Sequence, residues 1–426
     1  MRDQIAPLLS ACLATLMCSG PAFAQAESPG AGQAIDLPEA ITRTLASNPY
    51  LTASGFDISV AEGRLLQAEL APRPELSVVL EDALGTDSFR GTRRADATVT
   101  LGWILERGLR QRRVSVGRAG VAVSTVDVEI VRLDAAAETA RRFLDCLAYQ
   151  ARLLNAEEAM RLAQAAVAAV RRRAAASLAT EAELARAEAE LVRAQLRYED
   201  YEHELLSAYH RLSAQWGETE PDFASVAGSL ESLPALEPFD ALLARVDANP
   251  DVARFVSQSR LDEAALELAR AQSRPNWRVS AGLRRIETSD DFALVGSVSV
   301  PLRLGNRNQG AIAEARANLA RTQIEATAAQ VGIETELFVL YQALQHDIQL
   351  PERLQADVVP RFEGALAATQ RAFELGRSSY LELRTVQTEL LEVNNDLLEA
   401  HIDVHRLIIE IERLTGERFA SPRPTQ

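Results

Sequence analysis

The sequence predicts a mainly α-helical protein with a small β part, built as a tandem duplication of one unit. Its 426 residues are 47% hydrophobic and 25% charged, which is the composition of a folded chain. The duplication shows in the spacing of prolines, since Pro49 and Pro250 are 201 residues apart, and Pro74 and Pro275 are separated by the same 201 residues. Each repeat combines long Ala- and Leu-rich runs, typical of helices, with short alternating segments, typical of strands.

The N-terminus has the pattern of an export signal at residues 1–24. An apolar stretch at 5–17 is followed by Ala22-Phe23-Ala24, which matches the small-residue site where signal peptides are cleaved. Processing as a lipoprotein at Cys12 is the alternative, although the apolar stretch before this cysteine is short. Cleavage after Ala24 would leave Cys146 as the single cysteine, so that the exported protein could form no internal disulfide.

Charge and motifs argue against several classes of function. The formal net charge of −15 disfavours a nucleic-acid surface, which needs clustered basic residues. The sequence has no phosphate-binding loop, no nucleophile elbow and no Cys–His arrangement, so we expect neither an enzyme nor a bound cofactor. Beyond the signal, no run of 18 apolar residues occurs, so a membrane-spanning helix is not expected.

The first repeat unit, residues 25–216, is predicted to contain a helix, two strands and a long helical hairpin. The opening helix covers 37–71 and bends at Asn48-Pro49, because proline lacks a backbone donor and disfavours helix in the residue before it. The long helix covers 110–173. After a tight break, a return helix covers 179–216.

The second repeat unit, residues 238–416, follows the same plan. Its segments are an opening helix at 238–274, two strands, a long helix at 308–373, a break at Gly376 and a return helix at 379–415. Residues 217–237 contain prolines and glycines and join the units as a linker, and 417–426 form a C-terminal tail.

The lengths of these helices predict how they pack. A helix of about 64 residues spans ~95 Å at 1.5 Å per residue, which is too long for a globular core. It should therefore lie in a coiled coil or an array of helices. The opening and return helices together are about as long, so we expect them to lie end to end beside the long helix.

The four strand-like segments indicate that part of the protein lies in a membrane. Their apolar positions are Leu76, Val78 and Leu80; Ala97, Val99, Leu101 and Trp103; Trp277, Val279, Ala281 and Leu283; and Phe292, Leu294, Gly296, Val298 and Val300. Strands of about ten residues with one apolar and one polar face are typical of outer-membrane barrels, although a soluble sheet with one solvated face would alternate in the same way. The export signal, together with the Arg and Asp pairs near the hairpin ends, favours the membrane.

Four strands cannot close a barrel alone, because the N–H and C=O groups at their edges would face lipid unpaired. Several protomers must therefore contribute strands. Three copies, for example, would supply twelve strands.

Three stretches resemble the TolC-type outer-membrane efflux channel family. They are DLPEAITRTLASNPYL at 36–51, VPLRLGNRNQGAIAEARANL at 300–319 and AFELGRSSYLELRTVQTELLEV at 372–393. With the repeat, the similarity covers nearly all of the chain beyond the signal. The family implies a trimeric twelve-stranded barrel in the bacterial outer membrane, continued by an α-helical barrel across the periplasm. The second stretch is most similar to CzcC-like channels of heavy-metal efflux, although Leu304-Gly305 stands where an aromatic residue is commoner.

The resemblance implies the exit duct of a tripartite, proton-driven efflux pump for divalent cations such as cobalt, zinc or cadmium. Its partners would be a periplasmic adaptor protein, an inner-membrane transporter of the RND type, two further copies of the chain and outer-membrane lipid. The same fold could instead serve multidrug or other organic-compound efflux, or type I protein secretion. A periplasmic coiled-coil adaptor is an alternative of another class, but it would carry one helical hairpin, whereas this chain predicts two.

Two tight turns, one in each repeat, are the main candidate site. Gly376 ends a long helix where a left-handed cap suits glycine, and Ser378 or Ser379 can then cap the return helix. Ser177 is the equivalent of Gly376 in the first repeat, and Thr180 is the equivalent N-cap. Helix-hairpin chemistry explains these residues by itself; the resemblance implies that the turns also contact the adaptor. The implied contact residues are Ser177, Leu178, Thr180, Leu375, Gly376, Ser378 and Ser379.

One glutamate follows each turn, Glu183 in the first repeat and Glu382 in the second. In the resembling family, an acidic residue at this spacing can line the narrow periplasmic entrance, where a threefold axis makes a ring of three carboxylates. Such a ring attracts cations and raises carboxylate pKa values by mutual repulsion; a solvated helix face is the alternative. Arg377 and the run Arg171–Arg173 could hold a closed entrance through ion pairs, which are weak when exposed.

The histidines do not predict a metal centre. His401 and His405 lie four residues apart on one helical face, but two ligands make an incomplete site. A surface or interhelical pair is the simpler explanation. A duct that bound its cargo tightly would also release it slowly, so no metal site is expected.

Overall fold

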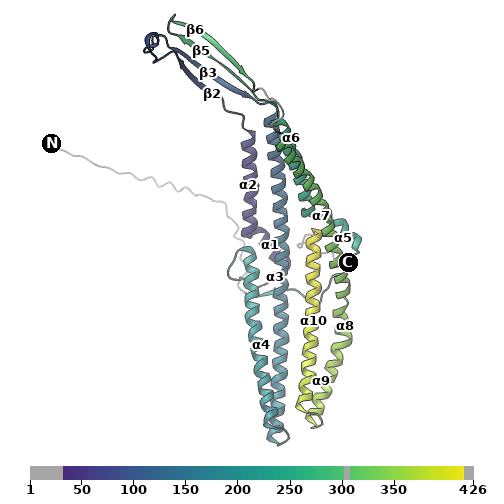
Figure 1. The fold of residues 1–426 in the computed structure, drawn as a ribbon. Coiled ribbons are helices and arrows are strands. Elements are labelled where there is room, and N and C mark those ends of the chain that lie inside the picture. Colours follow the sequence, from purple (N-terminus) through teal and green to yellow (C-terminus); the bar gives the residue numbers. More distant parts are fainter. Residues whose placement is uncertain (1–31, 302–307, 417–426) are drawn as a thin grey trace, which may run out of the picture.

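The computed structural model describes residues 32–301 and 308–416. Over these ranges the chain is mainly helical and elongated, with a four-stranded sheet at one end and the turns of two helical hairpins at the other (Figure 1). In this part of the chain, no helix is both long and apolar enough to cross a membrane. The expected signal peptide at 1–24, the tail at 417–426 and Leu304-Gly305 lie outside the described residues.

The Asn-Pro motif of the first unit joins two helices and anchors the joint to the end of the return helix. α1 covers Leu37–Ser47 and α2 covers Pro49–Glu69, with Asn48 between them in an extended conformation. The Asn48 side chain accepts a hydrogen bond from a backbone N–H in the first turn of α2 (2.9 Å) and donates one to the Gln215 carbonyl (2.7 Å). Pro49 stands where a helix N–H has no intrahelical partner, so no hydrogen bond is lost.

The second unit repeats this joint. α5 (Phe239–Val246) and α6 (Pro250–Gln272) meet near Asn249, which caps α6. The Asn249 side chain donates hydrogen bonds to the carbonyls of Arg413 and Leu414 (3.1 and 2.7 Å), at the end of the second return helix. The duplicated motif therefore ties the start of each unit to its end, and the bend predicted at the first motif is confirmed.

A glycine completes each joint. Gly217 and Gly416 follow the return helices with φ of 86° and 69°, in the left-handed region that favours glycine. A Cβ atom at the first glycine would lie 3.2 Å from Pro49, and one at the second would lie 3.3 Å from Asn249. Close packing against the Asn-Pro joint explains why a glycine recurs at the same place in both units.

The first helical hairpin consists of α3 (Leu109–Ala175) and α4 (Glu181–Ser213), followed by a 3₁₀ turn at Ala214–Trp216. α3 is one continuous helix of 67 residues. α2 and α4 both pack along α3, one beyond the other (Figure 1). The expected end-to-end arrangement of two shorter helices beside one long helix is thus confirmed.

The second hairpin differs, because its long arm is broken. The single helix predicted over 308–373 is wrong. The structure has α7 (Gln309–Asp347), α8 (Leu350–Arg353), a π-helical turn at Leu354–Val358, α9 (Val359–Glu374) and the return helix α10 (Tyr380–Thr415). Pro351 and Pro360 stand in the first turns of α8 and α9. Each proline lacks a backbone donor and crowds the preceding turn, which explains why this arm is segmented where α3 is continuous.

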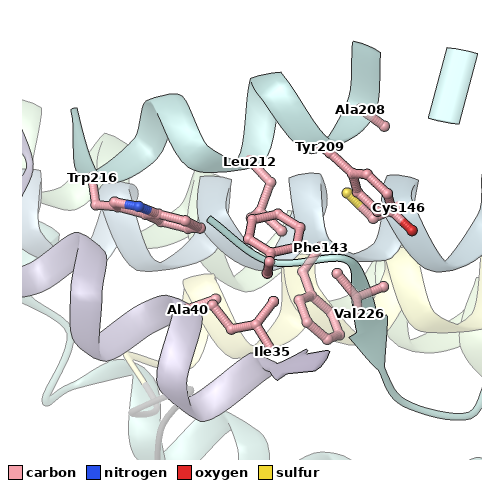
Figure 2. Close-up of a cluster of buried hydrophobic side chains, with 10 residues drawn as sticks. Ile35, Ala40, Phe143, Cys146, Ala208, Tyr209, Leu212, Trp216 and Val226 are labelled. Carbon is pink, nitrogen blue, oxygen red and sulfur yellow. The ribbon is translucent and has the colours of Figure 1, made fainter. Parts of the chain in front are cut away.

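The expected linker contains a strand and covers a core. β1 (Ala34–Asp36) pairs in parallel with β4 (Ser225–Ala227), a contact too short to predict from alternation. Figure 2 shows the cluster around this pair, which consists of Ile35, Ala40, Phe143, Cys146, Ala208, Tyr209, Leu212, Trp216, Phe223 and Val226. Burial raises the pKa of the Cys146 thiol to about 12, so this sulfur is an inert part of the core.

The linker also packs against α3 and α10, beside two histidines. The His405 ring donates to the carbonyl oxygen of Leu230, 2.9 Å from Nε2. His401 is 6% exposed, and neither of its ring nitrogens has a hydrogen-bond partner among the described residues. Burial lowers the pKa of both imidazoles; at His401 the Glu231 carboxylate opposes this shift and His405 adds to it.

The four longer strands form one antiparallel sheet in the order β2-β3-β5-β6. They cover Glu75–Glu81, Asp96–Leu105, Trp277–Ile286 and Asp291–Ser299. One row of the register holds Val78, Val99, Leu283 and Leu294, which are 67%, 45%, 55% and 89% exposed. On the other face Ser280 and Ser297 share a hydrogen bond (2.8 Å), and Arg284 pairs with Glu81. The predicted alternation is confirmed, with large apolar side chains uncovered on one face.

The sheet has two open edges. Within the described ranges, β2 pairs only with β3, and β6 only with β5. The outward N–H and C=O groups of these two strands are therefore available to another chain.

Protonation of His401, which is buried, and of His405, which is partly buried, should weaken the packing of the linker. Their pKa values are lowered on folding, so the unfolded chain binds protons first and stability falls as the pH drops through about 6.5. We expect the fall in Tm of the detergent-solubilised protein between about pH 7.5 and about pH 5.5 to shrink when His401→Gln and His405→Gln are combined. The exposed His346→Gln is the control, and an equal fall in all three proteins would contradict the assignment.

Candidate functional site

The turns of the two helical hairpins lie at the same end of the molecule, farthest from the sheet (Figure 1). The first turn joins α3 to α4 and the second joins α9 to α10. Both expected tip segments, 177–180 and 375–379, are in these turns. The structure thus brings together two segments about 200 residues apart in sequence.

Each tip ends its long arm with the same pair of backbone hydrogen bonds. In the first, the N–H of Leu178 donates to Arg173 O (2.8 Å) and that of Ser177 to Ala174 O (2.9 Å). The second tip has the equivalent bonds, from Arg377 to Ala372 O (2.8 Å) and from Gly376 to Phe373 O (3.0 Å). This Schellman pattern requires a left-handed residue, and φ is 58° at Ser177 and 72° at Gly376. The first unit therefore uses serine in a conformation that favours glycine.

Each return helix begins with a reciprocal capping box. The Thr180 hydroxyl accepts from the N–H of Glu183 (3.2 Å), whose carboxylate accepts from the N–H of Thr180 (2.8 Å). Ser379 and Glu382 form the same two bonds in the second unit (3.2 and 2.9 Å). Ser379, rather than Ser378, is the N-cap. Both glutamates thus have a structural role within the protomer, which the sequence analysis did not assign to them.

Glu382 has one more partner than Glu183. The Ser378 hydroxyl donates to its carboxylate (2.6 Å), and this bond, with the backbone N–H of Ser379, lowers the pKa of Glu382. Within one protomer the direction is opposite to the increase expected from a ring of three carboxylates. Arg377 is exposed and forms no ion pair among the described residues. The expectation that Arg377 helps to hold a closed entrance through ion pairs therefore concerns contacts with neighbouring protomers, and it stays a prediction.

Arg173 connects the two tips. Its guanidinium lies over the Phe373 ring, 4.4 Å from the centroid, and donates to the carbonyls of Phe373 (3.0 Å) and Ser378 (3.3 Å). It also reaches Leu178 O in its own turn (3.4 Å). The run Arg171–Arg173 is expected to form ion pairs, yet Arg173 instead binds carbonyls and an aromatic face. Arg171 does pair with Glu188, within the first hairpin (2.8 Å).

Next to the tips, toward the sheet end of the molecule, an apolar cluster joins the two hairpins. It contains Leu162, Ala166, Val167, Val170, Ala187, Leu366, Phe373, Tyr380, Leu383 and Leu390. Beside it Arg384 of α10 pairs with Glu190 of α4 (2.6 Å). Sequence reasoning missed these contacts, because they join residues far apart in the chain and no local pattern marks them. These contacts hold the two hairpins together next to their tips.

The described residues contain no group of three or more His, Cys, Asp or Glu side chains that could hold a metal ion. His401 and His405 belong to the contact between the linker and α10, far from the tips.

Comparison with known proteins gives one family and several relatives. Residues 40–218 match the family described as outer membrane efflux protein. The cobalt-zinc-cadmium resistance protein CzcC of Cupriavidus metallidurans is 28% identical over 356 residues, which cover 83% of this chain and 83% of that protein. The nickel and cobalt resistance protein CnrC of the same organism is 26% identical over 309 residues, covering 70% and 73%.

Solved structures share the fold. A membrane protein from Pseudomonas aeruginosa matches with a TM-score of 0.74 at 16% identity, over 89% of this chain and 93% of that one. The CmeC outer membrane channel of Campylobacter jejuni matches with a TM-score of 0.73 at 13% identity, over 92% and 87%. At these identities the likeness shows that the fold is common to all three chains.

The two tips should respond oppositely to exchange of their left-handed residues. Ser177→Gly should relieve strain and stabilise the first tip by about 1 kcal/mol, whereas Gly376→Ser should destabilise the second by about the same amount. Hydrogen exchange of the Leu178 and Arg377 amides measures this, with about fivefold slower and about fivefold faster exchange expected. Equal rates in wild type and both variants would contradict the strain assigned to Ser177.

Proposed function

We propose that this chain is a member of the family of outer membrane efflux proteins, which its residues 40–218 match, and that it is the exit duct of a tripartite pump for divalent heavy-metal cations. The chain is an outer membrane efflux channel with a periplasmic helical extension, and not an enzyme. Its assembly, its partners and its cargo are supported by different features of the molecule.

The sheet supports a homotrimer. A four-stranded sheet with two open edges would leave backbone groups unpaired in lipid, whereas twelve strands from three chains can close into a barrel. Exposed apolar side chains such as Leu76, Leu294 and Val298 would then face lipid, and the polar face would line the lumen. The two hairpins of each protomer would continue the barrel as a helical tunnel through the periplasm.

The tips support contact with a periplasmic adaptor. Leu178 and Leu375 stand at the turns and are 66% and 69% exposed, so a trimer would present both in three copies at its far end. Backbone caps hold these turns in shape, which suits a surface that binds a partner. An RND-type transporter in the inner membrane would supply the proton-driven work that a passive duct cannot perform.

The entrance would lie between the tips of three protomers. There Glu183 and Glu382 would each form a ring of three carboxylates that attracts cations. Arg173 holds the second tip against the first within a protomer, so its bonds to Phe373 and Ser378 would have to rearrange if the second hairpin moved outward. Contact with the adaptor would provide the free energy for this movement.

The proposal that the cargo is a divalent metal cation rests on one observation. The relatives that match most of this chain are named for resistance to cobalt, zinc and cadmium, or to nickel and cobalt. The acidic character of the chain, with a net charge of −15, suits a path for cations.

Deletion of the gene should lower the tolerance of its host to cobalt, zinc or cadmium, because the pump would lose its exit. Growth on graded concentrations of each metal measures this, and a plasmid copy should restore tolerance. Unchanged metal tolerance with lost resistance to organic compounds, or lost protein secretion, would contradict the cargo and support the alternatives with the same fold. Recovery of the protein in the periplasmic extract, rather than with outer-membrane porins, would favour the adaptor alternative.

Removal of the two carboxylates should reduce the preference of the channel for cations. Glutamine at the third position can still accept the capping bond, so Glu183→Gln with Glu382→Gln removes charge while keeping the helix starts. In planar bilayers at low salt, the cation-to-anion permeability ratio should fall by about twofold or more. Glu181→Gln with Glu374→Gln is a control of equal charge change near the same tips. An equal effect of both pairs would contradict specific rings.

A further inference from the structure

An arginine marks the border of the apolar sheet face nearest the helices. Along β3 the exposed positions are Val99, Leu101, Trp103 and Leu105. Arg107 follows Leu105 by two residues, and its guanidinium lies 4.4 Å from the centroid of the Trp277 ring. Trp277 is itself the partner of Leu105 in the register. Arg107 therefore stands on the apolar side of the sheet, just where the apolar band ends.

Beside this arginine is a cavity of about 300 Å³, between the start of α3 and the end of α6. We call it the arginine cavity; its polar lining comes from Arg107, Gln111, Arg112, Ser115, Glu267 and Arg274. It lies within one protomer, beneath the central strands β3 and β5, which run into these two helices (Figure 1). Closure of the sheet edges by other protomers would leave this position inside each protomer unchanged.

The arginine cavity has an excess of positive charge in an acidic protein. Glu267 is the only carboxylate in its lining, and it is already shared by Arg112 (3.6 Å) and Arg270 (2.7 Å). Arg107 and Arg274 form no ion pair within the described ranges. The first turn of α3 has no acidic residue, so its positive end adds to the field. An anion would therefore be attracted to this place.

We propose that the arginine cavity binds the phosphate of an anionic phospholipid in the leaflet that faces the periplasmic helices. The inference deepens the proposed function, since it rests on the sheet crossing a membrane. Arginine binds phosphate through paired N–H groups, and tryptophan is enriched at the level of lipid head groups. Trp277 contacts Arg107 of the cavity lining, and Trp103 lies on the same apolar face two residues before Leu105 in β3, where the acyl chains of the same lipid would run. That continuity with an apolar band favours a lipid over free phosphate.

The test is lipid binding by the full protein, measured by native mass spectrometry of the detergent-solubilised channel. Phosphatidylglycerol and phosphatidylcholine with identical acyl chains are titrated in parallel. The wild type should bind the anionic lipid about tenfold or more tightly than the neutral one, and the combined Arg107→Gln, Arg112→Gln and Arg274→Gln variant should lose this preference. A single Arg274→Gln variant should lose part of it.

The control removes the same charge at the opposite end of the sheet, through Arg90→Gln, Arg93→Gln and Arg94→Gln. These exposed arginines lie between β2 and β3, and their removal should leave the preference unchanged. Equal lipid preference in the wild type and the first triple variant would overturn the proposal, as would full displacement of the lipid by millimolar inorganic phosphate. The same spectra report the oligomer, so a monomer would count against the proposed channel, whereas a trimer without lipid preference would count against this inference alone.

Discussion

The open edges of the four-stranded sheet are the constraint on which the rest of the structure depends. β2 and β6 each leave a row of backbone donors and acceptors beside an apolar face, and lipid can satisfy neither row. Pairing with further copies of the same chain satisfies both rows without any new element. In the proposed homotrimer, three copies of each long hairpin would lie around one axis, and the strand barrel would continue as a barrel of helices. Because the unit is duplicated within the chain, each protomer contributes two pairs of strands and two helical hairpins.

Much of the fold was predictable, because its signals are local and occur twice. The Asn-Pro motifs predicted bends, and the structure shows why each needs its glycine: Asn48 and Asn249 bind carbonyls at the ends of the return helices, where Gly217 and Gly416 pack against them. The broken arm of the second hairpin was missed, although Pro351 and Pro360 were visible in the sequence. The prediction assumed that the second long helix would be continuous like the first, and it did not take into account the lost backbone donor at each proline. The β1–β4 pair was missed because three residues carry no periodic signal.

The candidate site was predictable in its caps and not in its contacts. The Gly376 cap and the Thr180 N-cap follow from residue type and position, whereas the sequence leaves the second N-cap open between Ser378 and Ser379, and the structure identifies Ser379. The bonds of Arg173 to Phe373 and Ser378 join residues about 200 positions apart, and only folding places them together. The same is true of the arginine cavity, where α3 and α6 meet. Glu183 and Glu382 each cap a helix within the protomer, and in the proposed trimer they would also face the axis.

Disulfide cross-linking between the sheet edges of neighbouring protomers tests the central claim most directly. In a chain whose three natural cysteines are replaced by serine, Ser77→Cys on β2 is combined in turn with Ala293→Cys, Val295→Cys and Ser297→Cys on β6. Because these side chains lie on the polar face of the two edge strands, at least one combination should give a covalent trimer after oxidation in the outer membrane, while the single variants give none. Only monomers in all three combinations would contradict a barrel shared among protomers.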